Sequence, residues 1–127
     1  MVRLTDRFGA AEAALSGSLG ALARSVDDPA LAPVIAGHAA QHAWHVELWL
    51  ARRPVVAGTR SNDPLADGDV AVDLAHAYGE VVPGLLERAR AWREATDASI
   101  DAPTARVLDL VIADLGAEVV SAAAIRR

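Results

Sequence analysis

Apolar residues recur at the spacing of one face of an α-helix along most of the chain. Turn-forming residues interrupt this pattern and divide it into four predicted helices. Three of them cover residues 5–25, 31–53 and 69–96, and the fourth begins near Pro103. Pro83 falls in the middle of the third helix and predicts a kink or local bulge, because it has no N–H to donate to the Gly79 carbonyl. Many alanines and few aromatic residues favour packed helices over a sheet, so we predict an all-α protein.

The connections between the predicted helices are short, long and short. Residues 27–29 and 97–101 form brief turns, which make the helices on either side of each turn antiparallel. Residues 54–68 are rich in turn formers and are long for a loop within a compact domain. Such a loop fits a crossover that travels the length of a bundle. We therefore predict a single domain over residues 1–127, a four-helix bundle with a long crossover between its second and third helices.

The second predicted helix carries three of the four histidines of the chain. His38, His42 and His45 are spaced i, i+4 and i+7, so they fall within about 60° of arc on one face. Apolar residues, among them Trp49, share that face, and Glu47 is the one charged residue before the arginines that end the helix. A helix that is apolar nearly all round is a buried one. We therefore expect the histidines to point into the core.

Counting residues from the turns places several polar side chains at one height in the predicted bundle. His42 lies roughly 20 Å along its helix, and the same height falls near Glu12 on the first helix and Glu118 on the fourth. The predicted layer consists of Glu12, His42, His45, Asp114 and Glu118. Imidazoles and carboxylates bind zinc, iron and manganese, so this layer is a candidate metal site. We expect His38 and Tyr78 to contact the ligands without binding the metal.

The same layer also has a structural explanation that needs no metal. A histidine placed against a buried carboxylate satisfies both groups, and such a pair is costly to break. Three buried histidines and two buried acids are more polar groups than a structural core usually carries. The pattern therefore leaves iron, manganese, zinc and no metal at all open as alternatives.

With this arrangement the chain resembles the ferritin-like superfamily, which places a glutamate on each of two helices and Glu-x-x-His on each of the other two. Glu12 resembles the glutamate of the first helix. His42-Ala-Trp-His45 resembles the motif of the second helix, with His42 in place of the glutamate. The segment from Asp114 to Ala117 occupies the position of the fourth-helix motif. The resemblance implies a ferritin-like fold with a metal-dependent oxidoreductase or oxygenase site. The alternative is a non-catalytic bundle that binds a partner or a small ligand.

Composition argues against several classes of function. The net charge is -5 and no basic run stands out, so nucleic acid is not an expected partner. Without cysteine the chain has no disulfide and no thiolate metal site. No segment is long and apolar enough to span a membrane, and the first residues do not form a signal peptide. We therefore expect a cytoplasmic protein.

A second apolar strip on the second predicted helix consists of Ala40, Trp44 and Leu48. It lies roughly 130° away from the histidine face. Large apolar residues on the outside of a bundle suggest a subunit interface, so we expect a homodimer. The alternative is that the 54–68 crossover covers the strip.

Overall fold

The computed structural model describes residues 2–52 and 73–125, and the regular secondary structure in these two ranges is entirely helical. The predicted all-α class is therefore confirmed. The chain divides into two compact units, Met1–Val72 and Asp73–Arg127. The predicted 54–68 crossover lies outside the described residues. The single four-helix bundle, which depends on that crossover, stays a prediction.

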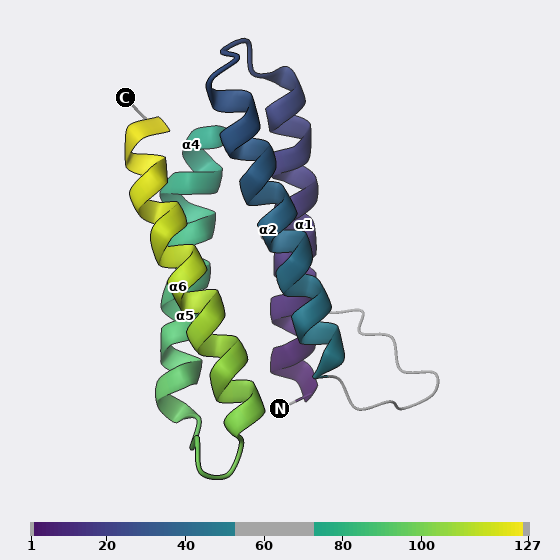
Figure 1. The fold of residues 1–127 in the computed structure, drawn as a ribbon, viewed down its shortest axis with the longest axis vertical. Helices are drawn as coiled ribbons and strands as arrows, with labels where there is room; N and C mark the ends of the chain where they lie inside the picture. Colours follow the sequence, from purple (N-terminus) through teal and green to yellow (C-terminus); the bar gives the residue numbers. More distant parts are fainter. Residues whose placement is uncertain (1, 53–72, 126–127) are drawn as a thin grey trace. The chain divides into compact units, whose positions relative to one another are not determined.

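The first unit is an antiparallel pair of helices, α1 (Val2–Ser25) and α2 (Leu31–Ala51), which lie side by side in Figure 1. In the short turn between them, the Asp28 Oδ1 accepts a hydrogen bond from the Ala30 N–H at 2.8 Å. This bond satisfies a backbone donor just before α2 begins, which is a common use of aspartate in turns. The buried apolar residues of the pair follow the helical spacing and include Phe8, Leu15, Leu19, Ile35 and Trp49.

A hydrogen bond between the two helices fixes how they are aligned along their length. The Ser16 hydroxyl donates to the Ala39 carbonyl at 2.7 Å, using the second lone pair of an oxygen that belongs to the backbone of α2. Ser16 lies one turn beyond Glu12 on α1, and Ala39 lies almost one turn before His42 on the antiparallel α2. The bond therefore sets Glu12 at the height of His42 and His45.

The second unit is one long, composite helix packed against another. The composite helix is formed by α4 (Leu74–His76), the π-helical turn η1 (Ala77–Val81) and α5 (Val82–Ala95), and its partner is α6 (Ala102–Ile125). α5 and α6 are antiparallel neighbours in Figure 1. The buried residues of this unit include Tyr78, Leu85, Leu108, Val111 and Leu115.

The π-helical turn directly precedes Pro83 and confirms the expected local bulge. The Val82 N–H donates to the carbonyl of Ala77, five residues earlier, whereas an α-helix would use the residue four earlier. Proline has no N–H and its ring crowds the carbonyl of the preceding turn. The widened turn therefore lets the helix continue through Pro83.

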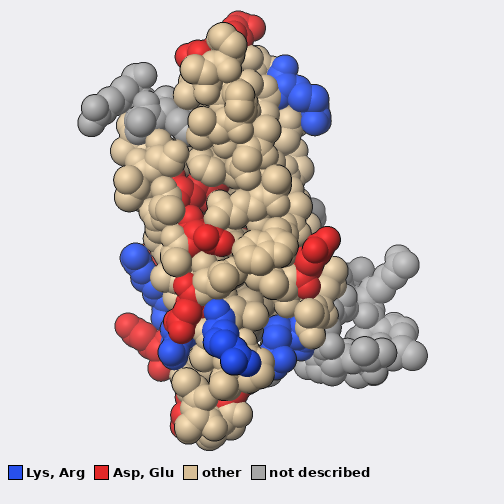
Figure 2. Space-filling model, viewed as in Figure 1, with Lys and Arg blue, Asp and Glu red and all other residues tan. Residues whose placement is uncertain are grey.

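The surface carries charges of both signs. Figure 2 shows both arginine and acidic side chains among a larger area of uncharged surface. One pair joins α5 to α6, with the Arg93 Nε 2.7 Å from the Asp109 Oδ1. An exposed ion pair of this kind contributes about 1 kcal/mol or less. None of the described helices has a stretch that is both long enough and apolar enough to cross a membrane.

Ser16→Ala should destabilise the first unit by removing the bond between α1 and α2. We expect the free energy of unfolding to fall by about 1 kcal/mol, the net contribution of one hydrogen bond, as measured by urea denaturation followed by circular dichroism. Ser25→Ala is the matched control, because the Ser25 hydroxyl donates to the Leu22 carbonyl of its own helix. Equal stability of the two variants would show that the Ser16 bond does not hold the helices in register.

Candidate metal site

Three residues of α2 present nitrogen atoms to α1 from a single face. His42, His45 and Trp49 are spaced i, i+3 and i+7, which places them within about 60° of one another around the helix. Their exposed fractions are 0%, 0% and 1%. The prediction that His42 and His45 point into the core is therefore confirmed.

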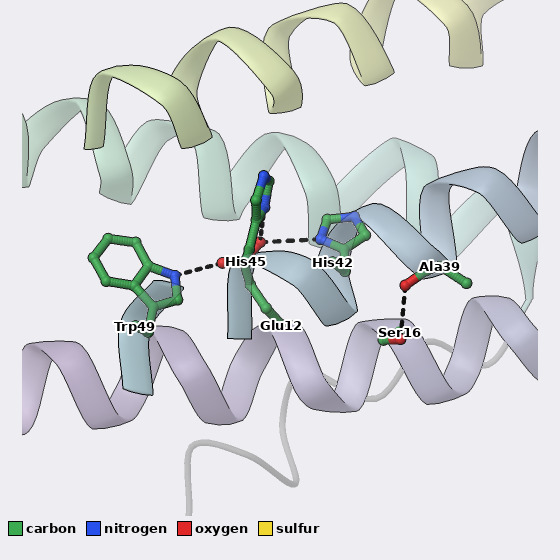
Figure 3. A network of polar contacts seen from close by, with 6 residues as sticks. All are labelled: Glu12, Ser16, Ala39, His42, His45 and Trp49. Carbon is green, nitrogen blue, oxygen red and sulfur yellow. Dashed lines mark hydrogen bonds and ion pairs between the residues drawn. The ribbon is translucent and has the colours of Figure 1, made fainter. Parts of the chain in front are cut away.

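Glu12 of α1 faces these three residues and is itself fully buried. Its Oε1 lies 2.6 Å from the His45 Nδ1 and 3.1 Å from the His42 Nδ1. Its Oε2 lies 2.5 Å from the Trp49 Nε1 (Figure 3). These four side chains are called the Glu12 cluster below. Every nitrogen that contacts the carboxylate within the cluster comes from α2, and each comes from a different turn.

The cluster keeps Glu12 in its ionised form. Burial raises the pKa of the carboxyl, but the hydrogen bonds and charges of His42 and His45 together lower it more, so the pKa lies below the ordinary value of 4.5. An ionised carboxylate can only accept hydrogen bonds. Both Nδ1 atoms and the indole nitrogen of Trp49 are therefore donors, and Glu12 is a negative charge surrounded by three N–H groups.

The Glu12 cluster contains the kinds of atom that bind a divalent transition metal. One ligand atom from each of Glu12, His42 and His45 lies within 4.8 Å of the other two. Two imidazoles and one carboxylate form a ligand set found at non-haem iron and zinc sites. A metal would use the lone pairs that now hold the two Nδ1 protons, because ligating histidine is deprotonated at the ligand atom. This buried group could therefore hold a metal ion.

The other predicted site residues lie elsewhere on the described helices. His38 is half-buried on α2, where its ring is not one of the groups that converge on Glu12. Asp114 and Glu118 lie on α6 of the second unit, the first half-buried and the second buried. Tyr78 is buried on η1 of the same unit, and burial, with the negative charge of Glu118, raises the pKa of its phenol well above the usual value. The roles expected for these four residues stay predictions.

Comparison of the chain with protein-family models, with curated proteins and with solved structures finds no match. The resemblance to the ferritin-like superfamily therefore stays a prediction, which depends on Glu12 and on the segments 42–45 and 114–117. The functional interpretation of the chain depends on the geometry of the Glu12 cluster.

The apolar strip of Ala40, Trp44 and Leu48 lies roughly 130° around α2 from the histidine face, and the centroid of the Trp44 ring is 5.8 Å from that of His45. Ala40 is exposed, Trp44 is 44% exposed and Leu48 is half-buried. The 54–68 segment, which was the alternative cover for this strip, lies outside the described residues. The strip is therefore an accessible apolar surface within the part of the chain that the structure describes.

One member of the cluster is missing from the sequence prediction. Trp49 counts there only as an apolar residue of the histidine face, whereas its indole N–H is a hydrogen-bond partner of the Glu12 carboxylate. The available signal is its position, four residues after His45 on the same face. A buried indole usually finds an acceptor, so a tryptophan beside buried histidines indicates that an acceptor faces all of them.

Glu12→Gln should destabilise the protein because the new amide turns an acceptor into a donor. We expect the free energy of unfolding at pH 7 to fall by roughly 1–3 kcal/mol, the cost of a buried donor without an acceptor. Folding lowers the pKa of Glu12, so its carboxylate stabilises the fold above about pH 4.5, and this contribution is lost as the pH falls through the lowered pKa. The gap between wild type and variant, measured by urea denaturation, should therefore narrow below pH 4.5.

Glu47→Gln is the matched control for this experiment. Glu47 is exposed on α2, so its neutralisation should change the stability by less than about 0.5 kcal/mol at either pH. If Glu12→Gln behaves like Glu47→Gln, the cluster does not stabilise the folded state.

Proposed function

We propose that the protein binds a divalent transition metal ion through Glu12, His42 and His45 and uses it in an oxidoreductase or oxygenase reaction. The observation that carries the proposal is the convergence of three ligand-type side chains in a region withdrawn from water. The proposal includes a ferritin-like four-helix bundle as the architecture, with a long crossover between its second and third helices.

The chemistry of the donor atoms narrows the choice of metal. Imidazole nitrogens suit iron, manganese and zinc better than calcium and magnesium, which prefer sites made entirely of oxygen. Iron or manganese bound here would supply electron transfer, and three protein ligands leave room for water or a substrate. The chain contributes one negative charge and two imidazoles at fixed positions, and it keeps bulk water away from them.

A second candidate function is a non-catalytic helical protein that binds a partner or a small ligand. The observation that favours it is that both oxygens of Glu12 accept hydrogen bonds from N–H groups of α2. A buried carboxylate with satisfied oxygens stabilises a fold without any metal. Metal binding is the property that separates the two candidates, because only the first one needs it.

We also propose that the protein is a homodimer whose subunit interface contains the strip of Ala40, Trp44 and Leu48. The exposed side of α2 supports this assembly because it is apolar at most positions. Its exposed residues between Pro33 and Leu50 are Pro33, Val34, Ala36, Gly37, Ala40, Ala43, Trp44, Glu47 and Leu50. An apolar face with one charged side chain resembles the core of a subunit interface more than an ordinary solvated surface.

Zn(II), Mn(II) and Fe(II) should each raise the melting temperature of chelator-treated protein if the metal site exists. Binding to the folded state alone adds RT ln(1 + [L]/Kd) to its stability, about 2.7 kcal/mol at a free metal concentration of 100 Kd. His42→Ala and His45→Ala should lose most of this gain. The gain in wild type should also shrink as the pH falls, because protons compete for the imidazole lone pairs.

His76→Ala is the matched control for the metal titration, because His76 lies on the second unit and outside the Glu12 cluster. Its Nε2 is 3.4 Å from the Glu80 Oε2. It should respond as wild type does. A wild-type protein that responds no more than His42→Ala and His45→Ala would favour the non-catalytic candidate. The redox reaction is tested separately, by dioxygen uptake of Fe(II)-loaded wild type compared with Fe(II) alone and with His42→Ala.

Trp44→Glu should shift the protein toward monomer by placing a charge in the proposed interface. The molar mass from light scattering at several protein concentrations measures the effect, and Glu87→Ala, at an exposed position of α5 away from the strip, serves as the control. Wild type that is already monomeric at high concentration would contradict the homodimer.

A further inference from the structure

We propose that Trp49 is a positioning residue that makes Glu12 a one-oxygen ligand and thereby selects the metal. This inference depends on the metal site proposed above and deepens it. Trp49 does not bind the ion, because an indole N–H is only a donor. Its effect is to occupy the Glu12 Oε2, which leaves Oε1 as the oxygen that faces the two histidines.

The geometry divides the carboxylate into two sides. The His42 and His45 Nδ1 atoms both approach Oε1, and the Trp49 Nε1 approaches Oε2 at 2.5 Å (Figure 3). The two residues able to ligate a metal therefore share one oxygen, and the residue unable to ligate holds the other. Rotation of Glu12 to offer both oxygens to an ion would leave the Trp49 N–H without this acceptor in a buried position, which is costly.

The Trp49 ring is itself held in place, so the N–H has little freedom to follow Glu12. It is 1% exposed and packs on the Phe8 ring with centroids 5.4 Å apart. A Cβ placed on Gly9 would lie 3.7 Å from the Trp49 Cβ, so the backbone of α1 lies directly against this side chain. A donor fixed in this way can orient the carboxylate that it bonds, as partners of metal ligands do elsewhere.

A one-oxygen carboxylate favours small ions with few ligands over large ions with many. Calcium takes six to eight oxygen ligands and often uses both oxygens of a carboxylate, whereas zinc is usually four-coordinate with nitrogen and oxygen ligands. Trp49 should therefore raise the affinity for Zn(II) and lower the relative affinity for Ca(II). The ratio of the two affinities is the signature of its role, because a loss of packing alone would not change metal preference.

The test is a calorimetric titration of the full chain with Zn(II) and Ca(II), comparing wild type, Trp49→Phe and Trp92→Phe. Phenylalanine keeps an aromatic ring for contact with Phe8 and removes the N–H. Trp92→Phe makes the same change at another buried tryptophan, on the second unit. We expect Trp49→Phe to lose about 10- to 100-fold in Zn(II) affinity, with a smaller loss or none for Ca(II), and Trp92→Phe to match wild type.

A second measurement uses wild type alone, so it remains decisive if Trp49→Phe does not fold. In a nitrogen-15 NMR spectrum, the Trp49 indole N–H signal should stay protected from exchange with water when Zn(II) is added, since the bond to Oε2 is kept. Rapid exchange of that signal upon Zn(II) binding would overturn the inference. So would equal Zn(II) affinity of wild type and a folded Trp49→Phe, although the metal site would then stand. Wild type that binds no Zn(II), Mn(II) or Fe(II) would overturn both.

Discussion

A carboxylate that is charged and fully removed from water must receive its hydrogen bonds from the protein, and Glu12 imposes this requirement on the first unit. The desolvation of one such ion costs several kcal/mol, and only well-placed donors offset it. His42, His45 and Trp49 provide them, so the fold keeps this charge only while α1 and α2 hold one alignment. The Ser16 bond to Ala39 holds the same alignment one turn away.

The sequence of α2 suits this task because its polar atoms are concentrated on the side that meets Glu12. His42, His45 and Trp49 follow one another along α2, and all three contact the Glu12 carboxylate. Side chains on a helix lean toward its N-terminus, so residues from neighbouring turns can approach one point on a facing helix. The remaining surface of α2 is mostly apolar, which leaves Glu12 few competing partners on this helix.

The helices and the inward face of His42 and His45 could be predicted because both follow from local spacing along one segment. Glu12 is harder, since it lies at the edge of the apolar stripe of α1, where a lone glutamate is usually solvated. The only indication that Glu12 belongs to the site is that it lies at the same height as the histidines in the predicted bundle. The position of Trp49 beside the histidines indicates that an acceptor faces its indole N–H, but it does not say which residue supplies that acceptor. Trp49 and Glu12 lie 37 residues apart in the sequence, so their contact depends on how α1 and α2 are aligned.

In the second unit, too, the sequence locates a feature without specifying its exact structure. Pro83 predicts a disturbance of the helix because proline removes a donor, but the pattern does not say which backbone adjustment accommodates it. The π-helical turn from Ala77 to Val81 does so, and it carries the buried Tyr78. Local chemistry thus locates the irregularity, but the wider turn that accommodates it is seen only in the structure.

The distribution of donors around Glu12 bears on the choice between a structural network and a metal site. A network that only satisfied the carboxylate would gain as much by dividing the two histidines between its oxygens. Here both imidazoles meet at Oε1, and Oε2 is left to the one donor that has no lone pair to offer. A single divalent ion could take the place of the two Nδ1 protons, and the Trp49 bond to Oε2 does not involve those protons. Glu12, His42 and His45 could therefore hold a metal ion, and protons are the competitor that such an ion would have to displace.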